Sequence, residues 1–216
     1  MKVVAISVGG PRAATWRGRA VTTSIFKTAT TARVHIGKQN VEGDEQSDLS
    51  VHGGFEKAVY AYPAEHYEFW RRELPDTDLP WGAFGENFTT EGLLEVDVFI
   101  GDRFRVGTAE LVVTQPRMPC YKLAIRFDRL DIVKRFLESK RSGFYFSVST
   151  EGHASAGDRI ERVARDERAL SVADVVALYT MDTPMQPLLA RASDHPALPA
   201  GWREYFRKRM WAPDVQ

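Results

Sequence analysis

The side chain best suited to nucleophilic or metal chemistry is a single thiol in a proline-rich segment. Cys120 lies in residues 115–123, Q-P-R-M-P-C-Y-K-L, directly after an apolar stretch. The two prolines fix φ on either side of Arg117 and remove two backbone donors, which predicts a stiff, non-repetitive loop. A nearby cation, Arg117 or Lys122, would favour the thiolate, the form that attacks electrophiles and binds metals. From the loop alone, Cys120 as a small buried hydrophobe remains the alternative.

A second segment has the composition of an anion site. Residues 51–60, V-H-G-G-F-E-K-A-V-Y, contain His52, Gly53, Gly54 and Lys57. Adjacent glycines let the backbone approach a ligand and present successive N–H groups, while the lysine and the histidine add donors. The G-x-x-x-x-G-K-[ST] spacing of a phosphate-binding P-loop is absent. A plain Gly-Gly hairpin is therefore the alternative interpretation.

Three further polar residues are weaker candidates. Glu86 and Asn87 stand between aromatic residues in F-G-E-N-F at 84–88, where they could face a polar pocket or complete a satisfied turn. Lys27 lies in an early β-prone stretch, where a solvated strand face is the simpler interpretation. None of these residues defines a reaction alone.

The composition limits the class of protein. The 216 residues carry 29 Lys plus Arg and 29 Asp plus Glu, so the net charge gives no general affinity for nucleic acid or anionic membranes. One cysteine excludes an intrachain disulfide and the multi-cysteine zinc and iron–sulfur sites. Neither a secretory signal nor an apolar run of about 20 residues is present, so we expect a cytoplasmic protein.

Short strands must position these residues. Apolar alternation and turn signals predict a strand-rich body, with strands at 2–8, 24–27, 32–36, 143–148 and 158–163 and a meander over 96–115. Helical periodicity appears at 64–74 and 130–140. Many short strands with few crossover helices favour a mainly β fold, a β-barrel rather than a parallel α/β sheet.

The last quarter of the chain has a different pattern. After residue 163, helical patterns occur near 171–179, 187–192 and 199–210, separated by Pro and Asp. We therefore predict a body at 1–163 and a small three-helix module at 164–216. Such short helices have too little core to be stable alone, so the module should dock on the body or on a second subunit.

Taken together, the motifs resemble a known family. The segments V-H-G-G-x-x-K-A-V-Y-A-Y at 51–62, F-G-E-N-F at 84–88, I-G-D-R-F at 100–104 and Q-P-R-x-P-C-Y-K-L at 115–123 resemble the MOSC family in order and spacing. More narrowly, they are similar to its YiiM-type bacterial members. The resemblance spans roughly residues 1–163, and the tail resembles the three-helix module that follows the barrel in that group.

The resemblance implies a chemistry. It implies a β-barrel that binds a molybdopterin-type molybdenum cofactor, with Cys120 as the protein ligand to the metal, which agrees with the softness of a thiolate. The cofactor-binding candidates are His52, Gly53, Gly54, Lys57, Arg117 and Lys122, with Glu86, Asn87 and Lys27 added as pocket candidates.

The implied activity is reduction of N-hydroxylated bases such as 6-hydroxylaminopurine, which detoxifies them. Electrons would come from a separate donor protein, because the chain has too few cysteines for an iron–sulfur domain. A homodimer is a further expectation. Two alternatives stay open: a non-catalytic carrier of the cofactor or its sulfur, and an interaction module without a cofactor.

Overall fold

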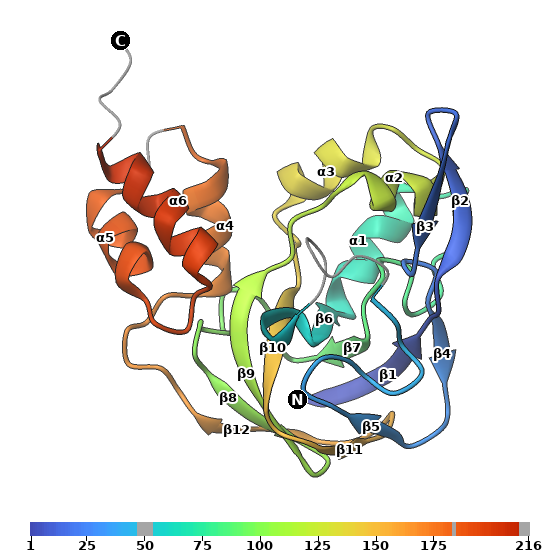
Figure 1. The fold of residues 1–216 in the computed structure, drawn as a ribbon, viewed down its shortest axis with the longest axis horizontal. Coiled ribbons are helices and arrows are strands. Elements are labelled where there is room, and N and C mark those ends of the chain that lie inside the picture. The colour runs from blue at the N-terminus through green and yellow to red at the C-terminus, as the bar shows by residue number, and fades with distance from the viewer. Residues whose placement is uncertain (47–53, 183–184, 212–216) are drawn as a thin grey trace.

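The centre of the molecule is one large, twisted sheet. The computed structural model describes residues 1–46, 54–182 and 185–211 (Figure 1). Its eight-stranded sheet has the order β12 (Ile160–Ala164), β8 (Arg103–Val106), β9 (Ala109–Pro116), β10 (Phe144–Thr150), β6 (Val59–Pro63), β7 (Phe88–Glu91), β1 (Lys2–Val8) and β4 (Thr28–Thr30). Neighbouring strands are antiparallel except β6 and β7, which run parallel. Two further two-stranded sheets complete the strands: the hairpin of β2 (Arg12–Trp16) and β3 (Arg19–Thr23), and the pair of β5 (Val34–Ile36) with the distant β11 (Gly152–Ala154).

The predicted closed, mainly β barrel is corrected in two respects. The sheet ends at β4 and β12. Between β1 and the residues at the start of β12, the described chain has an isolated bridge from Lys2 to Arg159 and backbone hydrogen bonds such as that from Val3 N to the Asp158 carbonyl at 2.9 Å, but no continuous ladder. The described chain is mixed α/β, with strands slightly exceeding helices. Closure would require a continuous ladder between the two ends, and β4 has only three residues to offer.

Three helices and an aromatic cluster cover one region of the sheet. Helices α1 (Glu65–Glu73) and α3 (Ile132–Ser139) confirm the helices predicted from periodicity. The sequence did not indicate α2 (Tyr121–Phe127), which begins directly after Cys120. The prolines of that segment end at Pro119, so they leave the next turn free to become helical. Leu123 and Phe127 then bury one face of α2 in a core shared with α1 and α3.

The other predicted strands have mixed outcomes. The strands at 2–8, 143–148 and 158–163 are confirmed within one or two residues, and 32–36 contains β5. Residues 24–27 form no strand, because local bonds from Ile25 to Thr23 Oγ1 and from Lys27 to the Ile25 carbonyl hold them in a turn. The meander begins only at β8, since residues 96–100 form turns and one bridge. The hairpin of β2 and β3 was missed.

The C-terminal helices are packed into the same core as the sheet. Helices α4 (Val172–Thr180), α5 (Gln186–Asp194) and α6 (Ala200–Trp211) lie together beside β9, at the left of Figure 1. A capping box at Ser171 starts α4, and the Val172 amide donates to the Val98 carbonyl at 2.9 Å. The fully buried Phe206 belongs to one hydrophobic cluster with the strands. Within the described part of the chain, no helix combines the length and the apolar character needed to cross a bilayer.

This shared core predicts the result of a truncation. Removing residues 164–216 should expose core residues of the body that pack against the module, among them Val98 and Ile100, and should cause aggregation or a large loss of stability. Size-exclusion chromatography and thermal unfolding would measure the effect. A truncated body that stays monodisperse, with an unchanged unfolding midpoint, would show that the module is an independent appendage. The division at residue 163 stays a prediction until then.

Candidate functional site

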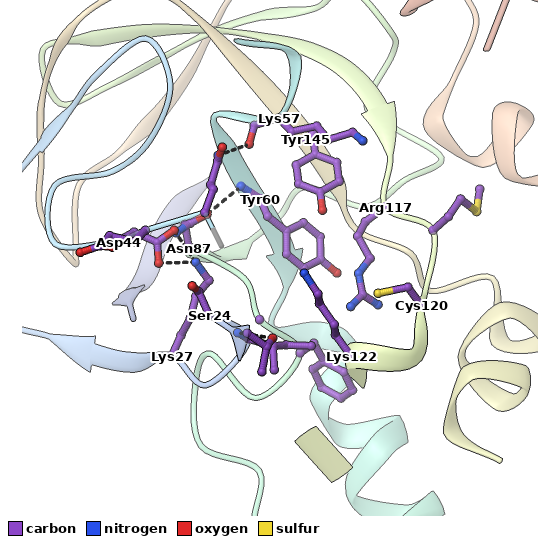
Figure 2. Close-up of a pocket in the computed structure, with 17 residues that line it drawn as sticks. Ser24, Lys27, Asp44, Lys57, Tyr60, Asn87, Arg117, Cys120, Lys122 and Tyr145 are labelled. Carbon is purple, nitrogen blue, oxygen red and sulfur yellow. Dashed lines mark hydrogen bonds and ion pairs between the residues drawn. The ribbon is translucent and has the colours of Figure 1, made fainter. Parts of the chain in front are cut away.

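A polar cavity opens where the Cys120 segment meets β3, β6 and β10. It is partly open to solvent, and the space in it that water-sized molecules can occupy is about 100 Å³. Figure 2 shows side chains from distant parts of the chain pointing into it. The lining residues used below are Ser24, Lys27, Asp44, Gln46, Lys57, Tyr60, Asn87, Arg117, Met118, Cys120, Lys122 and Tyr145.

Arg117 is the most unusual group of the cavity. Only 6% of its surface is exposed, and its Nη1 has no hydrogen-bond partner within the described structure. Its guanidinium carbon lies 4.9 Å from the ring centre of Phe136 and 5.6 Å from that of Tyr60, so aromatic faces partly stabilise the charge. A buried cation with an unused donor is costly unless a ligand completes its hydrogen bonds. The geometry therefore favours an anionic or strongly accepting ligand.

Lys27 and Asn87 share one buried carboxylate. Lys27 Nζ forms an ion pair with Asp44, and Asn87 Nδ2 donates to Asp44 Oδ2 at 2.8 Å. Burial lowers the pKa of Lys27, although the charge of Asp44 opposes that shift. Asn87 also accepts from the Tyr60 amide at 3.1 Å, which connects this cluster to β6. Lys27 is thus a pocket residue, and the solvated strand face was the wrong interpretation.

Two more lysines border the cavity. Lys57 is the last residue of the short 3-10 helix η1 (Phe55–Lys57), and burial lowers its pKa against the opposing charge of Glu56. Lys122, on the first turn of α2, is only 7% exposed. Together with Lys27 and Arg117, these residues give four cationic groups around a cavity whose described acidic lining consists of Asp44 and Glu45.

Cys120 and Tyr145 provide the remaining polar groups near Arg117. Cys120 caps α2 in an extended conformation and is partly exposed, so its sulfur is accessible from the cavity. Burial raises the pKa of Tyr145, while the positive charge of Arg117 partly offsets this shift. The Tyr145 phenol therefore stays protonated at neutral pH and can donate a hydrogen bond into the cavity.

The structure brings together most of the predicted site residues, but not all of them. Lys27, Lys57, Asn87, Arg117, Cys120 and Lys122 line the same cavity. Gly54, at φ 98°, precedes η1 and is not among the lining residues. His52 and Gly53 lie outside the described residues.

Glu86 is a correction, because it is not among the residues that line the cavity. The carboxylate is fully buried and accepts hydrogen bonds from the Tyr67 hydroxyl, from the Gly82 and Phe84 amides at 2.9 and 3.1 Å, and from Thr89 Oγ1 at 3.0 Å. Burial raises its pKa, and the hydrogen bonds from Tyr67, Gly82 and Thr89 oppose that shift. Glu86 therefore holds the 82–89 turn together, and it positions its neighbour Asn87.

Replacing Glu86 tests this structural role. Glu86→Ala should lower the free energy of unfolding by about 3 kcal/mol or more, because it leaves several buried donors without an acceptor. Chemical denaturation of the cofactor-free protein would measure the loss. Glu86→Gln should recover part of it, since one side-chain oxygen remains. Unchanged stability in the alanine variant would place Glu86 outside the hydrogen-bond network.

Several lining residues were missed from the sequence. Ser24, whose buried Oγ has no partner in the described structure, and Asp44 lie in irregular segments without a motif. Tyr145 carried a usable signal: in the strand at 144–150 it alternates with the core residues Phe144 and Phe146, so it had to face the opposite side.

Comparisons with known proteins agree with this architecture. The family model of the MOSC domain matches residues 48–161, slightly more than half of the chain, and the YiiM-like, 3-alpha helix domain matches residues 170–210. YflK of Bacillus subtilis (strain 168) is 39% identical over 207 residues, covering 96% of this chain and 93% of its own length.

Two further relatives extend the comparison. The crystal structure of YiiM from Geobacillus stearothermophilus superposes with a TM-score of 0.81 at 39% identity, covering 97% of this chain and 98% of the other. A Gibberella moniliformis protein named "Reductase" is 35% identical over 182 residues, which are 83% of this chain and 32% of that protein. The chain therefore belongs to the MOSC family and carries the YiiM-like three-helix domain.

Proposed function

We propose that the cavity binds a molybdenum–pterin cofactor and that the protein is a reductase of N-hydroxylated compounds such as 6-hydroxylaminopurine. The observation that carries the proposal is the buried Arg117, whose Nη1 has no hydrogen-bond partner in the described structure. A bound acceptor would satisfy this donor in the same cavity as the only thiol of the chain. Membership of the MOSC family and the relative named a reductase support the same reading.

The residues present fit such a group. Arg117, Lys57 and Lys122 are suited to a phosphate or to the charge of a metal–dithiolene unit. Cys120 supplies the thiolate that a soft ligand set requires, and the orphaned Ser24 Oγ adds a hydrogen-bonding group. When bound, the cofactor supplies two-electron reduction at its metal.

The reaction also consumes protons. Reduction of N–OH to N–H with release of water takes up two electrons and two protons, and the chain must deliver the protons. Burial lowers the pKa of Lys27, so its ammonium is a better proton donor than a solvated lysine. Tyr145 can orient the departing oxygen through its phenol hydrogen. Asp44 holds Lys27 in place through their ion pair.

The test uses protein purified from a host that makes the cofactor. Elemental analysis should find molybdenum, and a chemically reduced donor should support conversion of 6-hydroxylaminopurine to adenine. Bound molybdenum without turnover would favour the carrier alternative, and absence of molybdenum would favour an interaction module. The separate electron-donor protein, the homodimer and the cytoplasmic location stay predictions.

Lys57 provides a smaller, quantitative test. If its ammonium contacts the cofactor phosphate, Lys57→Ala removes one charge-assisted hydrogen bond, and retention should weaken by roughly ten- to a hundredfold. Lys57→Arg should recover part of the loss, since the charge survives while the planar fork fits differently. Cofactor dissociation rates at two salt concentrations would show this. Equal rates in all three proteins would place Lys57 outside the phosphate site.

A further inference from the structure

A second hollow lies beside the cavity, between the three-helix module and the sheet. It is more open than the first, and water-sized molecules can occupy about 380 Å³ of it. We call it the aromatic groove, and its lining residues are Glu56, Lys57, Gln115, Tyr179, Pro199, Gly201, Trp202 and Tyr205. Helices α4 and α6 form one wall, and η1 with the end of β9 forms the other.

The wall formed by the module presents aromatic rings. Tyr179 contacts Trp202 and Tyr205 with ring centres 5.6 Å apart in each pair. Tyr179 and Tyr205 remain 39% and 36% exposed, so ring surface is available to a ligand. Trp202 is held in place, because its indole Nε1 donates to Gln115 Oε1 at 2.8 Å. The rings therefore form a preorganised surface rather than loose side chains.

The groove borders the Cys120 cavity. Lys57 lines both hollows, and Gln115 stands two residues before Arg117 on the same strand end. Glu56 and Lys57 give the groove a polar edge next to the flat apolar rings. A ligand that spans this border at Lys57 would have one end in each hollow.

We propose that the aromatic groove binds the planar ring system of the substrate while its N-hydroxylated end enters the Cys120 cavity. The inference rests on the proposed reductase function and assigns the three-helix module a direct part in substrate binding. Flat aromatic faces favour stacking with a planar ring, and the Glu56 carboxylate can accept a ring N–H. A second copy of the chain is the competing occupant. Two other exposed apolar residues of the module, Met181 and Met185, lie outside the groove. Replacing one of them should leave ring binding unchanged, so it distinguishes substrate binding from contact with a second copy.

A binding experiment tests the groove without turnover. Adenine, a planar ring that lacks the reducible group, is titrated into the wild type, Tyr179→Leu/Tyr205→Leu and Met185→Ala by calorimetry. Leucine keeps apolar volume but removes the flat rings, so adenine affinity should fall roughly five- to a hundredfold. The Met185→Ala control should bind as the wild type does. Thermal unfolding confirms that the variants are folded, and Trp202→Phe provides a milder second variant that retains a ring.

Turnover separates ring binding from a general structural effect. With the molybdenum-loaded protein, kcat/KM for 6-hydroxylaminopurine should fall in the double variant, while kcat/KM for the ring-free N-hydroxyurea stays unchanged. An equal fall for both substrates, unaltered adenine affinity in the double variant, or no adenine binding by the wild type would overturn the proposal. A double variant that changes its oligomeric state but binds adenine as the wild type does would also overturn the proposal. Groove-dependent adenine binding without any turnover would instead refute the reductase function and leave the groove as a ring-binding site.

Discussion

Cys120→Ser is expected to reduce bound molybdenum to background while the protein stays folded. A serine oxygen has nearly the size of the sulfur but is a much harder ligand, poorly matched to a metal held by dithiolene sulfur. The side chain is partly exposed at the start of α2, so the exchange creates neither a large cavity nor a buried unpaired charge. Elemental analysis and pterin content of variant and wild type, purified in parallel, would measure the loss.

Met118 offers a matched control for this experiment. It lines the same cavity two residues before Cys120 and also carries sulfur, as a thioether. Met118→Leu keeps a similar volume, and molybdenum should be retained. If both variants lose the metal equally, the loss reflects disturbance of the segment rather than a missing ligand. Molybdenum at the wild-type ratio in Cys120→Ser would remove Cys120 as the ligand.

Arg117→Met is expected to separate binding from stability. The wild type buries a guanidinium with an unused donor, a cost that methionine removes while it keeps a long apolar chain near Phe136. The lost cation–π contacts with Phe136 and Tyr60 offset part of this gain. The free energy of unfolding of the cofactor-free protein should therefore stay within about 1 kcal/mol of the wild type.

Cofactor retention, unlike stability, should fall strongly in Arg117→Met. Loss of at least one charge-assisted hydrogen bond in a buried site should weaken binding by roughly ten- to a hundredfold or more. Arg117→Lys should bind at an intermediate level, because it keeps the charge but not the planar fork. Dissociation of the pterin from the loaded proteins, beside denaturation of the cofactor-free forms, gives both quantities. A variant that loses several kcal/mol of stability and binds normally would make Arg117 a structural residue.

The sequence alone determined the features that depend on neighbouring residues. Helical spacing predicted α1, α3 and the three helices of the module. A run rich in Val and Ile predicted β1, and alternation predicted β10 and β12. The resemblance to the MOSC family rested on short motifs, so it directed attention to Cys120, Arg117, Lys57 and Lys122 before any contact was known, and these four line one cavity.

Only the tertiary structure decided how distant segments meet. Asp44 reaches Lys27 and Asn87, 17 and 43 residues away, and Tyr145 comes from a strand that follows Arg117 after two intervening helices. The role of Glu86 depended on donors from α1 and its own turn, which nothing in F-G-E-N-F could distinguish from a ligand contact. Strand pairing and burial are non-local, because they depend on which ladder forms across the whole sheet, and a local pattern carries no information about that register.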